Sequence, residues 1–293
     1  MVEDWTAELP AARLVDLEVD ESAELGYGSF SKVYLARHKR RAEEWYAIKM
    51  APNADAGAAE ALAREWKILE VVREVDGVVE AYDFVAEGSH SCLVLEFMSG
   101  GELFERIVER ERYSEWDARN LARRLLSIVR GIHAKRVLHR DIKPENLLLS
   151  DDDDDVKLAD FGSAVLLEDE STVLGEPAGT ELYLAPEVLQ CLYSPRAPSP
   201  AGFASDVWSV GVVVFVLIAG FPPFANQDGQ VDEAVVDDIQ HGRLDFGDEV
   251  WDDVSTEAKS LVAALIQVSP EKRLSATAAL HHQWFHEDTQ ISD

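Results

Sequence analysis

The charge of this chain limits the partners that it can bind. Of its 293 residues, 56 are Asp or Glu and 27 are Lys or Arg, which gives a formal net charge of −29. Such a surface repels nucleic acids and anionic lipids, so we expect neither as a partner; the charge either favours basic partners or is only an adaptation for solubility or salt. A hydrophobic content of 47% excludes a largely disordered chain. The length exceeds the usual size of one compact core, so two lobes are expected.

Cysteine content and apolar runs indicate the compartment. A chain this long does not need a disulfide between its two cysteines, Cys92 and Cys191, so a reducing compartment is expected. The acidic N-terminal stretch lacks the apolar run of a signal peptide. The apolar run 207–220 has 14 residues, fewer than the roughly 20 that cross a bilayer, and is predicted to be a buried helix. We expect a cytoplasmic protein, with the nucleus as a second compartment.

Residues 22–97 show the alternation of strands, which predicts a small antiparallel-sheet lobe after an N-terminal extension of residues 1–21. One helix interrupts the strands between Ala58 and Val72. The strands are expected over 31–38, 44–50, 81–87 and 91–97.

Helical periodicity dominates from Gly100 onward, so residues 98–285 are predicted to form a larger, mostly helical lobe before a short acidic tail, 286–293. The fold class is therefore α+β with two lobes, and the two glycines within 98–103 mark the hinge. One helix should begin at Ser114, with Asp117 as its capping partner. Its buried face is expected to contain Leu121, Leu125, Ile128, Val129 and Ile132.

A glycine turn and a strand lysine suggest a phosphate site. Gly26 and Gly28, two apart at a strand end, allow backbone N–H groups to approach phosphate oxygens. Alternation places Ala47 and Lys49 on one strand face, and Glu65 on the predicted helix can reach that lysine. Each of these three features, taken alone, can instead be explained without a function: as an ordinary turn, a solvent-facing lysine and a surface glutamate.

The segment HRDIKPENLLL, residues 139–149, places many polar groups directly before a buried strand. Asp141 and Asn146 lie on this loop and Asp160 follows downstream, and their oxygens are of the kind that Mg²⁺ prefers. Lys143 can neutralise charge on a transferred phosphoryl group. The run DDDDD, residues 151–155, lacks the ligand spacing of a calcium loop and is predicted to be a solvated hairpin tip.

These motifs occur in the order found in the eukaryotic protein kinases, and the chain resembles that family over residues 22–285. The motifs are GYGSFSKV, YAIK, Glu65, HRDIKPEN, DFG, APE and SDVWSVG. Ser31 replaces the third glycine of the family's glycine loop. The resemblance implies a two-lobed fold that binds ATP with Mg²⁺ and phosphorylates proteins.

The resemblance also assigns roles to single residues. Lys49, held by Glu65, would bind the α and β phosphates, Asn146 and Asp160 would hold Mg²⁺, and Asp141 would orient the substrate hydroxyl, with Lys143 beside it. Val33, Ala47 and Leu148 would enclose adenine, with Leu95 behind it and the backbone of Glu96 and Met98 along its edge. The full set that it implies for ATP is Leu25, Gly26, Gly28, Val33, Ala47, Lys49, Leu95, Glu96, Met98 and Leu148.

Further motifs resemble the calcium/calmodulin-dependent kinase group. Lys143 is typical of serine/threonine kinases, and Thr180 matches the residue that recognises the substrate hydroxyl. Glu102 and Glu145 match positions that pair with an arginine upstream of the phosphorylated residue, whereas Val216 replaces the glutamate used for a second arginine. The resemblance therefore implies protein substrates with Ser or Thr and one upstream basic residue.

Regulation is where the chain departs from the group. Arg140 usually pairs with an activation-segment phosphate, and the group's phosphothreonine position holds Glu176, which we expect to supply a permanent weaker charge. The alternative is phosphorylation at Ser171 or Thr172. The tail after Phe285 is short and acidic, so we expect no self-contained calmodulin-binding segment. The proline-containing stretch 192–203 is predicted to be a loop.

Two other functions remain compatible with these residues. One is a catalytically weak kinase-fold scaffold that binds nucleotide and protein partners. The other is a small-molecule kinase, against which the peptide-presenting segment GTELYLAPE, residues 179–187, argues.

Overall fold

The computed structural model describes residues 12–28, 31–150, 155–167, 178–193 and 202–286. The chain forms two compact units. The first consists of Met1–Arg73 and Val79–Phe97, and the second of Glu74–Val78 and Met98–Asp293. The domain boundaries expected from the sequence stay predictions.

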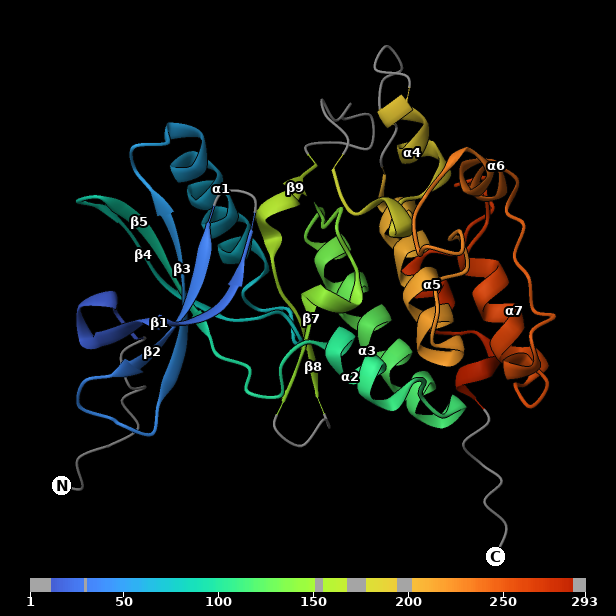
Figure 1. Ribbon diagram of the computed structural model, residues 1–293, viewed down its shortest axis with the longest axis horizontal. Helices are drawn as coiled ribbons and strands as arrows, with labels where there is room; N and C mark the ends of the chain where they lie inside the picture. Colours follow the sequence, from blue (N-terminus) through green and yellow to red (C-terminus); the bar gives the residue numbers. More distant parts are fainter. Residues whose placement is uncertain (1–11, 29–30, 151–154, 168–177, 194–201, 287–293) are drawn as a thin grey trace, which may run out of the picture. The chain divides into compact units, whose positions relative to one another are not determined.

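The first unit is built on a five-stranded antiparallel sheet with the strand order β1-β2-β3-β5-β4 (Figure 1). Its strands are β1 (Leu17–Tyr27), β2 (Lys32–His38), β3 (Trp45–Pro52), β4 (Ala81–Glu87) and β5 (His90–Glu96). The four predicted strands are confirmed. The strand-rich region starts earlier than residue 22, because β1 begins at Leu17 inside the stretch taken as an extension.

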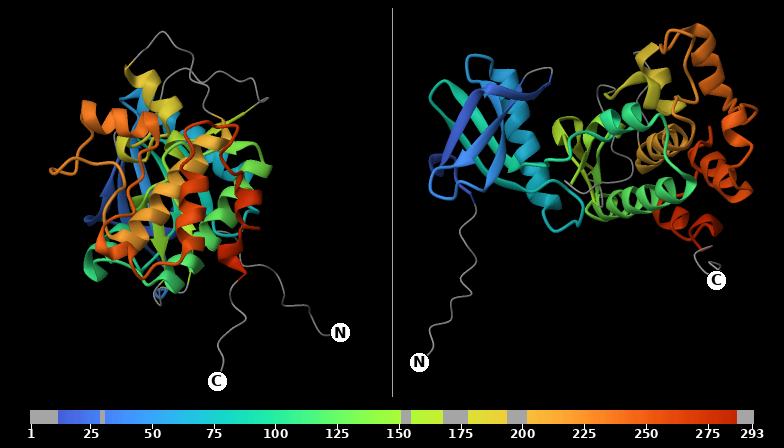
Figure 2. Two further views of the ribbon diagram at one scale, coloured as in Figure 1. Left: turned by 90° about the vertical axis from the view of Figure 1, so that its right-hand side faces the viewer. Right: turned by 60° about the horizontal axis from the view of Figure 1, so that its bottom comes forward.

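One face of the sheet is covered by the start of the described chain. Ala12 and Leu17 pack with Ala36, Tyr46 and Ile48 in a buried apolar cluster, to which Leu14 of the short turn η1 (Leu14–Asp16) adds. Alternation sends Ala47 and Lys49 to the opposite face. The helix α1 (Ala56–Val72) packs against β3, β4 and β5, as Figure 2 shows.

Helix α1 begins where a side chain can satisfy its free N–H groups. Asp55 accepts a hydrogen bond from the backbone N–H of Ala58, so the helix starts two residues before the predicted Ala58. Leu62 and Leu69 are buried along its inner side, and Glu65 lies between them with 3% exposure. The helix therefore places the Glu65 carboxylate among the buried apolar side chains of its inner side.

The second unit is mostly helical, with two short antiparallel strand pairs, β6 with β9 and β7 with β8. Its helices are α2 (Leu103–Arg110), α3 (Glu115–Ala134), α4 (Pro186–Tyr193), α5 (Phe203–Ala219), α6 (Glu233–His241), α7 (Thr256–Leu265) and α8 (Ala276–Ala279). Its strands are β6 (Val137–Leu138), β7 (Leu147–Leu149), β8 (Val156–Leu158) and β9 (Val165–Leu166), and its 3₁₀ turns are η2 (Pro144–Asn146), η3 (Phe161–Ser163), η4 (Glu181–Tyr183), η5 (Glu249–Trp251) and η6 (Gln283–Phe285).

Helix α5 is the core of the second unit. All of its residues from Ser205 to Ala219 are buried, and both α3 and α7 pack against it (Figure 2). This confirms the prediction of a buried helix at 207–220. Among the residues that the structure describes, no helix has both the length and the apolar character that a membrane span requires.

Helix α3 begins as the sequence predicts, because the Ser114 hydroxyl oxygen accepts a hydrogen bond from the Asp117 N–H. Four of the five residues expected on its buried face are buried, whereas Leu121 is only half-buried. Ala122 and Leu126 are buried in addition. The buried face is wider than one stripe because α5, α8 and β8 all contact this helix.

The predicted hairpin around residues 151–155 is present as the β7 and β8 pair. Residues 151–154 at its tip lie outside the described residues, as do residues 194–201 of the predicted loop. Asp155 is held by Arg124 of α3 through a hydrogen bond of 2.8 Å from Nε to Oδ1.

A buried ion pair joins α4 to the segment before α8. The Arg273 side chain has no exposed area, and its guanidinium donates to both carboxylate oxygens of Glu187 at 2.7 and 3.0 Å. It also donates to the carbonyl oxygens of Ala204 and Gln267. Removing one partner would leave a buried charge without compensation.

We predict that Arg273→Met lowers the free energy of unfolding by about 3–5 kcal/mol, because the Glu187 carboxylate would lose its partner. Chemical denaturation followed by circular dichroism measures this change. Arg243→Met is the matched control, since Arg243 pairs with Asp237 and Asp238 at the surface and should matter far less. Equal losses in the two variants would contradict the assignment.

Candidate active site

In the first unit, a buried ion pair links the sheet to α1. Lys49 Nζ lies 2.7 Å from Glu65 Oε2 and 2.9 Å from Oε1. The lysine side chain is 12% exposed and that of the glutamate 3%, so the ammonium group is held by a carboxylate away from bulk water. The structure contains the pair that the sequence predicted.

The register of the sheet gathers the predicted adenine and phosphate residues on one face. Val33 pairs with Lys49 across β2 and β3, and Ala47 pairs with Leu95 across β3 and β5. Residues directly opposite each other share a face, and so do residues two apart along a strand. The Lys49 ammonium thus lies beyond a row of small or aliphatic side chains, of which Ala47 is buried and Val33 and Leu95 are half-buried.

The predicted glycine turn lies at the end of β1, with Gly26 inside the strand and Gly28 directly after it. Gly26 pairs with Val33, and the backbone N–H of Gly28 donates to the carbonyl oxygen of Ser31 at 2.8 Å. Leu25 is 42% exposed, whereas residues 29–30 lie outside the described part of the chain. At the other end of the sheet Glu96 closes β5, with its N–H bonded to the carbonyl of Glu80, and Met98 already belongs to the second unit.

In the second unit, the carboxylate of Asp141 is the centre of a polar cluster. Its Oδ1 accepts from the backbone N–H of Thr180 at 3.0 Å and from the Thr180 hydroxyl at 2.9 Å. Its Oδ2 lies 3.0 Å from Lys143 Nζ and 3.1 Å from Asn146 Nδ2. Lys143 Nζ also donates to the Thr180 hydroxyl at 2.8 Å. The structure therefore brings four of the predicted site residues together.

Gly179 is what lets Thr180 reach Asp141. Its φ of +117° belongs to a region that side chains rarely adopt, and a Cβ there would lie 2.4 Å from the carbonyl oxygen of Arg140. A glycine is required at this close approach. Gly179 has no role among the sequence predictions, although it stands directly before Thr180 in the chain.

The loop that carries Asp141 is tied to the core helix α5. The buried carboxylate of Asp206 accepts from the backbone N–H groups of His139 and Arg140, both at 2.9 Å, and from His133 Nε2 at 2.9 Å. His139, fully buried, places Nε2 3.0 Å from the carbonyl oxygen of Ala159. Asp206 was noted only as part of a motif, so its role as the anchor was missed.

Asn146 and Asp160 lie at adjacent ends of β7 and β8. The N–H of Ala159 donates to the Asn146 carbonyl at 2.9 Å, which continues the β7 and β8 pairing up to Asp160. The Asn146 amide nitrogen is used by Asp141, which leaves its side-chain oxygen as the ligating atom. One amide oxygen and one carboxylate form a hard oxygen donor set that fits Mg²⁺.

Two site residues have left-handed backbone. The φ of Arg140 is +71° and that of Asp160 is +54°, a region that costs non-glycine residues about 1–3 kcal/mol each. Such conformations persist only where surrounding bonds hold them. The anchors are the Asp206 bond to Arg140 N–H and the packing of Phe161 against His139, with ring centroids 4.8 Å apart.

Comparison with known proteins identifies the family. The Protein kinase domain model matches residues 19–285. The chain belongs to the protein kinase family. It is 39% identical over 268 residues to a Calcium/calmodulin-dependent protein kinase type 1 of Caenorhabditis elegans, covering 90% of this chain and 73% of that protein. The same-named proteins of Caenorhabditis briggsae and Macrobrachium nipponense are 38% and 37% identical, over 90% and 89% of this chain and 72% of each of those proteins.

Kinases of this family use ATP as the phosphoryl donor. The Lys49–Glu65 pair and the polar cluster around Asp141 consist of residues from the motifs that define the family. Leu148, predicted to contact adenine, is half-buried in the middle of β7 and forms a bridge with Glu102. Lys49 and Glu65 lie in the first unit, and Asp141, Asn146 and Asp160 lie in the second.

Carboxylates gather near the cluster around Asp141. Burial raises the pKa of Glu102, and the nearby charges of Glu105 and Glu145 raise it further, while Lys143 opposes the shift. Glu145 Oε2 is buried and has no hydrogen-bond partner among the described residues. Glu105, three residues after Glu102 in the first turn of α2, was missed, although an acidic residue at this spacing could have been noticed in the sequence.

Of the predicted regulatory residues, Arg140 lies within the described part of the chain. Arg140 donates from Nε to the carbonyl oxygen of Ser163 at 2.5 Å. Burial lowers the pKa of its guanidinium, and the charge of Asp206 opposes that shift. Glu176, Ser171 and Thr172 lie outside the described residues, so their roles stay predictions.

We predict that Gly179→Ala lowers kcat about a hundredfold, because Thr180 would move away from Asp141 and misplacement of this size carries such a cost. A steady-state assay of phosphotransfer measures the effect. Gly229→Ala is the matched control, since Gly229 also has positive φ, +73°, but an added Cβ meets nothing within 4 Å. If both variants lost equal activity, the loss would reflect backbone strain alone.

Proposed function

We propose that this protein kinase transfers the γ-phosphoryl group of ATP to the hydroxyl of serine or threonine in proteins that carry a basic residue upstream. The observation that carries the proposal is the Asp141 carboxylate, which accepts from a threonine hydroxyl and lies 3.0 Å from a lysine ammonium. A carboxylate placed at a hydroxyl can accept its proton or orient it for attack.

The remaining roles follow from charge. Lys49, oriented by Glu65, would bind the α and β phosphates, and Lys143 would stabilise negative charge on the transferred group. Asn146 and Asp160 would hold Mg²⁺, which neutralises phosphate charge when bound. The side chain of Thr180 would contact the residue that receives the phosphoryl group.

The acidic cluster supports recognition of an upstream basic residue. Glu102, Glu105 and Glu145 repel one another, and Glu145 has a buried oxygen without a hydrogen-bond partner among the described residues. Buried carboxylates without partners are costly, and an arginine of the substrate would supply both charge and hydrogen bonds. The names of the relatives, calcium/calmodulin-dependent kinases, support the serine/threonine class.

We predict that the wild-type chain phosphorylates a serine peptide with an upstream arginine, and that Asp141→Asn lowers kcat about 10²–10⁴-fold, the range of proton-transfer contributions. Radiolabelled ATP measures transfer, and circular dichroism of each variant checks folding. Asp160→Asn should also lose activity. A scaffold without catalysis would give equal background in wild type and variants, and transfer to free small molecules or to tyrosine would contradict the proposed substrate class.

We also predict that the preference for the upstream arginine weakens as pH falls. The pKa of Glu102 is raised, so this carboxyl loses its charge at a higher pH than an ordinary glutamate and then attracts arginine less. At neutral pH, removing the arginine should lower kcat/KM about tenfold, or about 1.4 kcal/mol. We compare a peptide that has the upstream arginine with one that lacks it. The ratio of their kcat/KM values, measured from pH 7.5 down to pH 5.5, should shrink.

Glu102→Gln is the control for this prediction, because its ratio should be smaller and independent of pH. If the wild-type kcat/KM ratio stayed constant over the pH range, or changed equally with pH in Glu102→Gln, Glu102 would not be the residue that recognises the arginine.

A further inference from the structure

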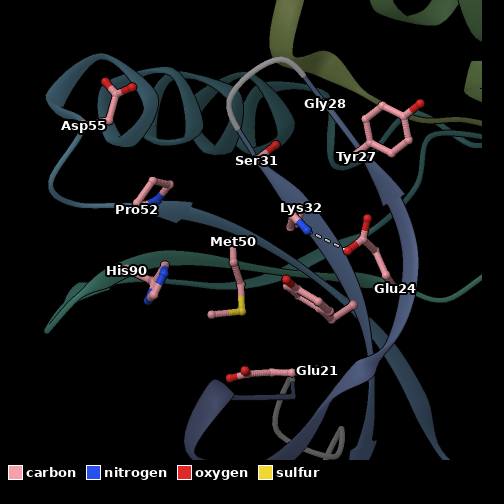
Figure 3. Close-up of a pocket in the computed structure, with 11 residues that line it drawn as sticks. Glu21, Glu24, Tyr27, Gly28, Ser31, Lys32, Met50, Pro52, Asp55 and His90 are labelled. Atoms are coloured by element: carbon pink, nitrogen blue, oxygen red, sulfur yellow. Dashed lines mark hydrogen bonds and ion pairs between the residues drawn. The ribbon is translucent and has the colours of Figure 1, made fainter.

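The first unit has a second concave surface, on the sheet face opposite Lys49. Tyr34 and Met50 form its half-buried floor, and alternation along β3 turns Met50 away from the Lys49 face. The hollow has a volume of about 630 Å³. Its rim comes from β1, from the segment before α1 and from His90 at the start of β5, as Figure 3 shows. We call this hollow the outer groove.

The rim of the outer groove is acidic. Glu21, Glu24 and Asp55 line it, against one lysine, Lys32, whose ammonium pairs with Glu24 at 2.8 Å. Asp55 is engaged at the start of α1, where it accepts from Ala58 N–H. The Glu21 carboxylate is exposed and has no ion pair with any residue that the structure describes. The groove therefore keeps an excess of negative charge after internal pairing.

The apolar lining suits the stem and the charged end of an arginine. Tyr27 is 84% exposed on one wall, and Pro52 borders Met50 on the other side (Figure 3). A guanidinium stacks favourably on a tyrosine ring, and a methionine adapts to irregular apolar surfaces. The outer groove thus offers an exposed aromatic ring on one wall and the unpaired Glu21 carboxylate elsewhere on its rim.

We propose that the outer groove is a docking site for an arginine-containing, partly apolar segment of a partner protein. Charge complementarity selects this occupant, because three carboxylates face one lysine in the groove and the whole chain carries a net charge of −29. The open shape and the volume fit a peptide segment rather than a single ion. Gly28 and Ser31 also line the groove, so a docked segment contacts the glycine turn.

This inference names a second protein-binding surface for the proposed kinase, and its test does not depend on phosphotransfer. The probe is a fluorescein-labelled peptide of arginine, leucine and alanine, without hydroxyl residues, so that it cannot be phosphorylated. Binding is followed by fluorescence anisotropy with the full chain carrying Glu102→Gln and Glu145→Gln, which removes the carboxylates proposed to bind substrate arginine.

In this background Glu21→Lys should weaken binding of the peptide about five- to tenfold, because an attraction becomes a repulsion. Glu18→Lys is the matched control. It changes the same charge on the same strand, but Glu18 is exposed opposite Arg37 and does not line the groove, so binding should stay within about twofold. Hydrogen exchange should show protection of β1 and the glycine turn when the peptide is bound.

Three results would overturn the proposal. Equal weakening by Glu18→Lys and Glu21→Lys would mean that only the overall charge attracts the peptide. Absence of binding in the Glu102→Gln, Glu145→Gln background would mean that the substrate cluster is the sole basic-peptide site. Concentration-dependent self-association of the wild type that Glu21→Lys abolishes would identify the occupant as a second copy, through its basic tract 37–41, rather than a partner protein.

Discussion

The second unit depends on one buried carboxylate. Asp206 lies on the core helix α5 and accepts from two consecutive backbone N–H groups, those of His139 and Arg140, and from His133. Burial alone would raise the pKa of Asp206. This effect is outweighed by the hydrogen bond from His133, the charges of His133 and His139, and the bond from the His139 backbone. The pKa of Asp206 therefore lies below its ordinary value. A carboxyl with a lowered pKa in the folded state stabilises that state above its unfolded pKa, and this contribution is lost as pH falls through the folded value. At neutral pH the anchor is therefore fully charged, and hydrogen bonds to a charged group contribute about 1.5–3 kcal/mol each.

That stabilisation offsets strain elsewhere in the site. Arg140 and Asp160 both adopt the left-handed region, and Gly179 approaches the Arg140 carbonyl more closely than any side chain would allow. With Arg140 held by Asp206, the next residue, Asp141, turns its carboxylate to Thr180, Lys143 and Asn146. The backbone thus fixes the positions of these polar groups, and in the proposed function such fixed groups would stabilise charge without reorganisation.

Patterns that repeat along the chain were readable from the sequence, and contacts between distant residues were not. Alternation predicted that Ala47 and Lys49 share a face, and the helical position of Glu65 predicted its ion pair with Lys49. The start of β1 at Leu17 was missed because its pairing partner, His38, supplies the reason for a strand there. The His133 contact to Asp206 spans 73 residues, and the left-handed φ of Arg140 follows from that anchor rather than from any preference of arginine. Glu105 gains its importance from the proximity of Glu102 and Glu145, which no single motif encodes.

The most direct test of this account is native-state hydrogen exchange of the His139 and Arg140 amides, measured together with kcat in Asp206→Asn. If Asp206 anchors the loop, exchange of these two amides should accelerate about 10- to 100-fold in Asp206→Asn, as expected from the loss of one or two hydrogen bonds to a charged group. The kcat of this variant should fall as well. Asp232→Asn is the comparison, because Asp232 also accepts two backbone N–H groups but caps α6 at the surface, and it should leave both quantities unchanged. Unaltered protection of His139 and Arg140 together with an unaltered kcat in Asp206→Asn would contradict the claim that this carboxylate positions the catalytic loop.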